Sequence, residues 1–116
     1  MRESINREST IQAAIRLALG QRPELVLWRN NTGVALHSGG ARVVYGLAPG
    51  SSDLIGVLAP SGRFVALEVK SPTGRSSVDQ EKFLHLVRSR GGFAAVVRSV
   101  EEANAAIDRA LQGADQ

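Results

Sequence analysis

The sequence predicts an α/β domain in which a mixed central β-sheet is flanked by α-helices. Residues 53–70 are expected to form an antiparallel hairpin and residues 63–98 a strand–helix–strand crossover, so the sheet should combine antiparallel and parallel pairs. Helical periodicity at both ends of the chain supplies the flanking helices. The length of 116 residues and the hydrophobic fraction of 43% suit one core, and we expect a single domain over residues 1–116.

Each element is predicted from a local pattern. Apolar residues at three- and four-residue spacing predict the first helix, which Gly20 ends, and Ser77 with Gln80 forms a capping-box pattern for the second. Residues 34–49 give mixed signals, and residues 112–116 are expected to fray. The expected elements are, in order, a helix from about Ser4 or Asn6 to Leu19, strands over 25–28, 42–45, 53–58 and 63–70, a helix from Ser77 to about Arg90, a strand over 93–98 and a helix over 100–111.

Composition excludes several classes of site. The chain has no cysteine, which excludes disulfides, thiolate metal sites and a cysteine nucleophile, and its two histidines are too far apart in sequence to suggest a zinc cluster. The N-terminal residues show no signal peptide, and no apolar segment approaches the length of a membrane span. We therefore expect a protein of the cytoplasm. Basic residues outnumber acids between residues 29 and 82, which favours a polyanionic ligand such as nucleic acid.

The strand over residues 63–70 ends in two charged residues. Strand alternation places Glu68 and Lys70 on one face and Val65, Leu67 and Val69 on the other, with the Cα atoms of Glu68 and Lys70 about 6–7 Å apart. Taken alone, the pair is explained more simply by a strand end that reaches solvent.

The preceding strand supplies a second carboxylate. Asp53 opens that strand, and an antiparallel hairpin with its turn near Ser61 would bring Asp53 to the same end of the ladder as Glu68 and Lys70. Two carboxylates there would form an oxygen-rich site suited to Mg²⁺ or Mn²⁺. Asp53 could instead cap its own loop.

Two helical residues could join these groups. Glu8 lies three residues before Ile11 and seven before Ile15, on the apolar face of the first helix, where a carboxylate is costly unless it is paired or bound to metal. Its place in the first turn, favoured by the helix dipole, explains it equally well. Gln80 shares a helix face with Phe83 and could reach the site, in addition to its capping role.

These residues together resemble the VRR-Nuc domain, the virus-type replication and repair nuclease branch of the PD-(D/E)XK superfamily. The resemblance covers nearly the whole chain, and its most specific parts are residues 50–56 (GSSDLIG), residues 68–72 (EVKSP), Gln80 with Phe83, Glu8, and residues 28–33 (WRNNTG). The family often has proline immediately before the metal-binding aspartate, and this chain has Ser52.

The resemblance implies a restriction-endonuclease-like core and a role for each site residue. Asp53, Glu68 and the Val69 carbonyl would bind Mg²⁺ or Mn²⁺, and Glu8 would contribute directly or through water. Lys70 would orient or activate the attacking water and stabilise the phosphate, and Gln80 would support the active site. Separately from the family, Arg29, Arg75 and Lys82 are candidate phosphate contacts, although each is more often a solvated surface charge.

The function we expect is that of a metal-dependent DNA endonuclease, structure-selective on branched DNA such as four-way junctions. Stand-alone members of the family resemble dimeric junction resolvases, which implies a homodimer of viral, phage or mobile-element type that acts in DNA repair or recombination. Two alternatives remain: a non-selective duplex or single-strand nuclease or nickase, and a catalytically silent nucleic-acid-binding module. Two carboxylates that face phosphate argue against a pure binding module.

Overall fold

The computed structural model describes the backbone of residues 2–116 and the side chains from residue 7 onward. Its elements are, in order, α1 (Arg2–Leu19), β1 (Leu25–Arg29), β2 (Gly33–Leu36), β3 (Arg42–Tyr45), β4 (Leu54–Leu58), β5 (Arg63–Val69), α2 (Val78–Ser89), β6 (Phe93–Val97) and α3 (Val100–Leu111).

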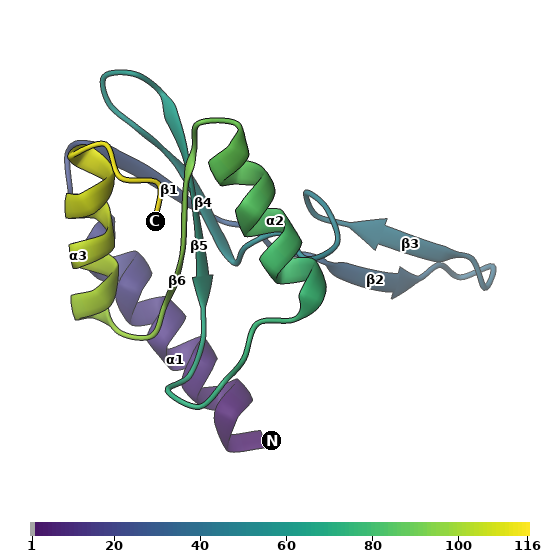
Figure 1. Ribbon diagram of the computed structural model, residues 1–116. Helices are drawn as coiled ribbons and strands as arrows, with labels where there is room; N and C mark the ends of the chain where they lie inside the picture. Colours follow the sequence, from purple (N-terminus) through teal and green to yellow (C-terminus); the bar gives the residue numbers. More distant parts are fainter. Residues whose placement is uncertain (1) are drawn as a thin grey trace.

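Four strands form the central sheet in the order β1-β4-β5-β6. β1 pairs antiparallel with β4 and β4 with β5, because the turn between β4 and β5 reverses the chain. β5 and β6 run parallel, joined by a crossover through α2. The predicted mixed sheet flanked by helices is therefore confirmed, with the helices on both sides of it (Figure 1).

The main core lies between the sheet and the helices α1 and α3. Leu67 and Val69 of β5 are buried on this side with Ile15 of α1 and Ile107 of α3. A smaller core lies on the opposite face, where Ala66 of β5 packs with buried side chains of α2 and β6. The two cores follow from strand alternation, since neighbouring residues of β5 point to opposite faces.

Helix α2 covers only half of its face of the sheet. It packs on β5 and β6. Across the same face, β4 and β1 contribute the pairs Ile55–Trp28 and Val57–Val26, and the β1 members of both pairs are exposed. The half of this face formed by β4 and β1 is therefore open, and we call it the open sheet half.

Strands β2 and β3 form a separate two-stranded arm that extends away from the central sheet (Figure 1). Only residues 42–45 had been expected as a strand, and the pairing of Gly33–Leu36 with them was not predicted. Val34, Leu36 and Val44 of the arm are each at least half exposed. The weak periodicity of residues 34–49 reflects this exposure, because no buried face selects an alternating pattern.

The remaining boundaries agree with expectation to within a few residues. The capping box is present, with the Ser77 hydroxyl accepting from Gln80 N and the Gln80 side chain accepting from Ser77 N. Residues 112–116 were expected to fray, but two of them are held by hydrogen bonds: the Asp115 carbonyl accepts from Ala94 N (3.0 Å) and the Gln116 carbonyl from Arg109 Nε (3.1 Å). Across the part of the chain that is described, no helix has the length and apolarity needed to cross a membrane.

Candidate active site

Asp53 and Glu68 lie side by side at one end of the β4–β5 ladder. Leu54 pairs with Leu67, so Asp53 and Glu68 occupy the next position along the two strands. The backbone ladder ends at this position. Beyond it, the Asp53 side chain binds the neighbouring strand, because its Oδ2 accepts a hydrogen bond from Val69 N (2.9 Å). This bond fixes the Asp53 carboxylate against β5.

The Glu68 side chain is buried and only partly satisfied. The residue is 1% exposed. Its Oε1 accepts a hydrogen bond from Gln80 Nε2 (3.0 Å), whereas its Oε2 is buried without a hydrogen-bond partner among residues 7–116. A buried carboxylate oxygen without a donor is costly, and such a group in a native protein requires an explanation.

Gln80 has both of the roles expected for it. Its Oε1 accepts from Ser77 N (2.8 Å), which satisfies a free donor at the start of α2. The opposite end of the same amide then points its NH₂ group at Glu68. The capping box therefore orients the amide that holds the Glu68 carboxylate.

Lys70 completes this group on the same face of β5. Its Nζ lies 3.8 Å from Glu68 Oε1, and the residue is itself buried. Lys70 N donates to the Val97 carbonyl (3.1 Å), which extends the parallel pairing with β6 by one residue. The ammonium therefore lies at the end of a firmly paired strand.

The electrostatics of the site favour a cation. Burial, the largest cause, and the adjacent Asp53 carboxyl together raise the pKa of Glu68 to about 9, while Lys70 opposes the shift. Two carboxylates in contact cannot both be ionised and satisfied, because each offers only acceptors. A shared proton or a bound cation resolves the conflict.

The residues present fit a divalent metal ion. The buried Glu68 Oε2 and the adjacent Asp53 carboxylate are hard oxygen donors of the kind Mg²⁺ and Mn²⁺ prefer, and Val69, whose carbonyl is the third candidate ligand, follows Glu68 at the end of β5. Over residues 7–116, no group of three or more histidine, cysteine, aspartate or glutamate side chains converges to hold a metal. The ligand set would thus rest on two carboxylates, with backbone and water oxygens completing it.

Glu8 lies at the edge of the site. It is half-buried, and a Cβ added at Gly74 would lie 3.0 Å from its Oε2, so Glu8 packs against the loop that follows Lys70. Arg98 holds this loop from the other side by donating to the carbonyls of Ser71 (2.6 Å) and Gly74 (2.7 Å). The charge of Glu8 contributes to the raised pKa of Glu68.

Asn30 organises the loop that leads to Asp53, a role that was not predicted. Its side-chain amide donates to Ser51 Oγ (2.7 Å) and to the Ser52 carbonyl (2.9 Å), and its backbone N–H donates to the Asp53 carbonyl (2.8 Å). Local sequence predicts only a turn at Asn30, because its partners are more than 20 residues away in sequence and are brought together by the fold. Nothing in the structure explains the buried Ser52 hydroxyl, which has no partner among the described residues.

The candidate phosphate contacts are spread over the surface. Arg29 pairs with the core residue Leu54, so alternation places it on the α1–α3 face, away from the carboxylates. Arg75 is exposed on the loop before α2. Both histidines, His37 and His85, are exposed.

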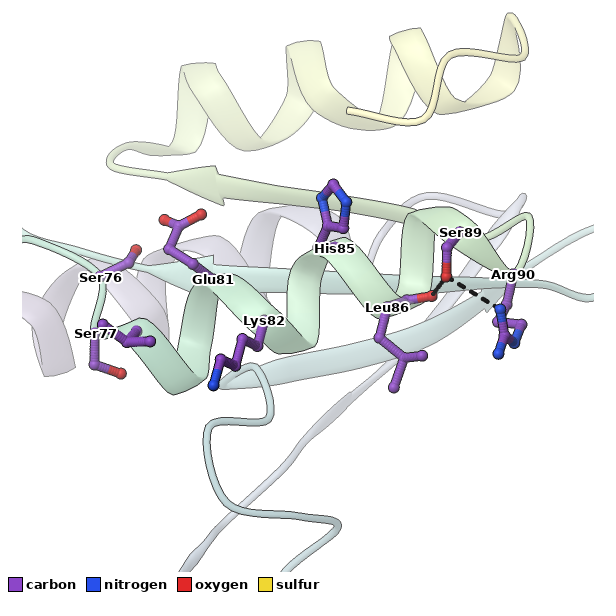
Figure 2. Close-up of a pocket in the computed structure, with 9 residues that line it drawn as sticks. Ser76, Ser77, Glu81, Lys82, His85, Leu86, Ser89 and Arg90 are labelled. Carbon is purple, nitrogen blue, oxygen red and sulfur yellow. Dashed lines mark hydrogen bonds between the residues drawn. The ribbon is translucent and has the colours of Figure 1, made fainter.

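Lys82 lines a surface hollow of about 660 Å³ along α2 (Figure 2). The hollow does not include the carboxylates, but it begins beside Ser77, the residue that caps α2 and fixes Gln80. In Figure 2, Lys82 and Leu86 project from α2 on the side opposite to Glu81 and His85, which point toward β6 and α3. Lys82 is exposed, whereas Leu84 and Val87 form the buried face of α2 against the sheet.

A mixed sheet flanked by helices, with an acid pair and a lysine at one end, defines a nuclease fold of the PD-(D/E)XK type. The VRR-NUC domain profile matches residues 6–101, and the chain belongs to this nuclease family. A solved structure described as a VRR_NUC domain has the same fold, with a TM-score of 0.56 and 22% identity over 88% of this chain and 95% of that one. No curated protein matches the sequence.

Proposed function

We propose that this nuclease domain is a Mg²⁺- or Mn²⁺-dependent DNA endonuclease that prefers branched DNA such as four-way junctions. The observation that carries the proposal is the contact between Asp53 and the buried Glu68, whose Oε2 has no protein donor within the described residues. A carboxylate pair with one buried oxygen left without a donor is costly in a binding module and useful in a metal-dependent nuclease.

Each residue of the site has a chemical role in this proposal. Asp53, Glu68 and the Val69 carbonyl would hold the metal, with Glu8 acting through water from the edge of the site. The bound metal would supply a water of lowered pKa and would neutralise charge on the phosphate. Val69 N fixes the Asp53 carboxylate, and Gln80 occupies Glu68 Oε1 so that Oε2 remains available.

Lys70 would act on the reacting phosphate. Its ammonium lies beside Glu68 in a largely buried setting, where a charge acts more strongly than it does in water. There Lys70 would orient the attacking water and stabilise the additional negative charge of the pentavalent phosphate. Lys82 and Arg75, both exposed near the start of α2, would hold flanking phosphates.

We propose further that the active form is a homodimer assembled through the β2–β3 arm. An isolated two-stranded hairpin is marginally stable in water, and this one exposes aliphatic side chains on its surface. Two arms packed about a two-fold axis would cover these side chains. Two active sites would then face two strands of a branched substrate.

The substrate preference is tested by cleavage of a labelled four-way junction and of its matching linear duplex, with Mg²⁺, with Mn²⁺ and with chelator. We expect metal-dependent cutting of the junction and little of the duplex, and no cutting by Asp53→Ala or Glu68→Ala. Equal cutting of both substrates would retain the nuclease and remove the branch preference. A folded parent that cuts neither substrate with either metal would contradict the enzymatic proposal.

The dimer is tested by light scattering after gel filtration. Leu36→Asp combined with Val44→Asp should convert the dimer to a monomer with an unchanged circular dichroism spectrum. The matched control is Leu17→Asp, since Leu17 is equally exposed but lies on α1. A monomeric parent at micromolar concentration would contradict the dimer.

A further inference from the structure

We propose that Trp28 is a stacking site for an unpaired nucleobase of the DNA strand that enters the active site. The inference rests on the proposed nuclease function and adds to it a residue that reads strand structure. It is carried by the position of Trp28 relative to the carboxylates and by the exposure of its indole.

Strand register places Trp28 next to the acid pair. Trp28 pairs with Ile55 of β4, and Ile55 pairs with Ala66 of β5. Asp53 lies two residues before Ile55 and Glu68 two residues after Ala66, which is the same direction in space because the strands are antiparallel. The side chains of these four residues and Trp28 therefore share one face of the sheet. Trp28 is the diagonal cross-strand neighbour of Asp53, at a Cα separation of about 7–8 Å, which an aromatic side chain can span. This distance equals about two stacked nucleotide steps of ~3.4 Å.

The indole is available to a ligand. Trp28 is 52% exposed because α2 packs on β5 and β6 and leaves the open sheet half uncovered. The partly buried Ile55 and Val57 provide an aliphatic floor around the ring. A large aromatic on such a floor, beside a catalytic centre, is suited to a flat apolar ligand that is part of the substrate.

A nucleobase is the ligand that this surface fits. The acid pair, which would hold the phosphate to be cut, lies on the same face of the sheet as Trp28, so a strand bound there would bring its bases past the indole. Stacking on an aromatic side chain is independent of base identity and requires a free base face, which a duplex does not offer in its interior. Trp28 would therefore favour a strand that is unpaired near the cut, as at a branch or a flap.

Intrinsic fluorescence tests the proposal directly, because Trp28 is the single tryptophan of the chain. The full-length Glu68→Gln variant in chelator is titrated with oligo(dT) and, separately, with a blunt duplex of the same length. We expect saturable quenching by oligo(dT) and clearly weaker quenching by the duplex, since only the single strand offers free base faces.

Substitutions at the site provide the second measurement, with fluorescence anisotropy of labelled oligo(dT) as the readout. Trp28→Ala should weaken binding by about 10- to 100-fold, and Trp28→Phe, which keeps an aromatic face, should recover most of that loss. The control is Val26→Ala. Val26 is 51% exposed on the same face, two residues further along β1 from the acids, and this substitution should change the affinity less than twofold. The Trp28→Phe variant also guards against a folding defect in Trp28→Ala.

Three results would overturn the stacking site. The first is binding of oligo(dT) by anisotropy without any change in Trp28 emission. The second is Trp28→Phe and Trp28→Ala binding as tightly as the parent. The third is emission that depends on protein concentration alone, which would place Trp28 between two copies of the chain. None of these depends on cleavage, so a parent that quenches normally but never cuts DNA would contradict the proposed function and leave the stacking site intact.

Discussion

At the scale of single residues, Glu68 shows a conflict between stability and activity. Its burial, its contact with Asp53 and its unpartnered oxygen all disfavour the ionised carboxylate in the metal-free protein. The proposed function requires that same ionised form, because Glu68 would be a metal ligand. Residues of this kind are expected where a site is built for a ligand and where the rest of the fold tolerates the cost.

The first prediction concerns Glu68→Gln in the metal-free protein. A carboxyl whose pKa rises from 4.5 to about 9 on folding destabilises the folded state once the pH exceeds the lower value. The cost is absent near pH 4, grows as the pH rises, and levels off above about pH 9. A neutral glutamine avoids it and can donate to Asp53, so Glu68→Gln should melt several degrees above the parent at pH 8 and within a degree of it at pH 4. Scanning calorimetry in chelator measures this, and a lower melting temperature for Glu68→Gln at pH 8 would contradict the buried-carboxylate account.

The second prediction separates the two roles of Gln80. Gln80→Ala removes the acceptor for Ser77 N, which is one half of the capping box, and the donor to Glu68. Ser77→Ala removes the hydroxyl that caps α2 and leaves the backbone donor that holds Gln80. Both should lose about 1 kcal/mol of unfolding free energy in urea. Only Gln80→Ala should reduce cleavage strongly, by about 10- to 100-fold, as observed for residues that orient metal ligands. Equal activity losses would mean that capping alone explains Gln80.

At the scale of elements, the candidate active site depends on the contact between α2 and the loop that precedes β4. Gly50, in the loop before Asp53, has φ +77°, and a Cβ there would lie 2.5 Å from the backbone of Asp79 in the first turn of α2. The loop thus touches the helix that carries Gln80, and only a glycine allows this approach.

The third prediction compares two glycine substitutions with the same backbone strain. Gly50 and Gly62 have nearly equal φ, but a Cβ at Gly62 would meet nothing within 4 Å. Gly62→Ala should therefore cost only the left-handed strain, about 1–2 kcal/mol, and leave cleavage unchanged. Gly50→Ala should cost clearly more in urea unfolding and reduce cleavage, because the loop and α2 must separate. Equal losses of stability would show that the contact with Asp79 is unimportant.

Elements and site were predictable from sequence to different degrees, for physical reasons. Strands with a buried face and helices with caps leave strong periodic signals, so the central sheet and the Ser77–Gln80 cap were predicted. The juxtaposition of Asp53, Glu68 and Lys70 followed from one hairpin register. Asn30 was not predicted as a support, because its partners are distant in sequence, and β2 was missed because exposure on both faces removes the pattern.

At the scale of the whole molecule, the two faces of the sheet differ in what they carry. The face covered by α1 and α3 holds the main core and stabilises the domain. The other face is shared by α2, the acid pair and the open sheet half, and the arm extends beyond it (Figure 1). The main core and the proposed substrate contacts thus lie on opposite faces, so this domain of 116 residues can expose the Trp28 ring and bury the Glu68 carboxylate.

The proposed function depends on the binding of a divalent metal by Asp53 and Glu68 together, and calorimetric titration of the chelator-treated protein with Mn²⁺ measures that binding. Titration at pH 7.5 in two buffers of different ionisation enthalpy also counts protons released. Because the pKa of Glu68 is raised to about 9, we predict binding that releases close to one proton per site, and no binding by Glu68→Gln or Asp53→Asn. A folded parent that binds no Mn²⁺ at millimolar concentration, or variants that bind it as the parent does, would contradict the account.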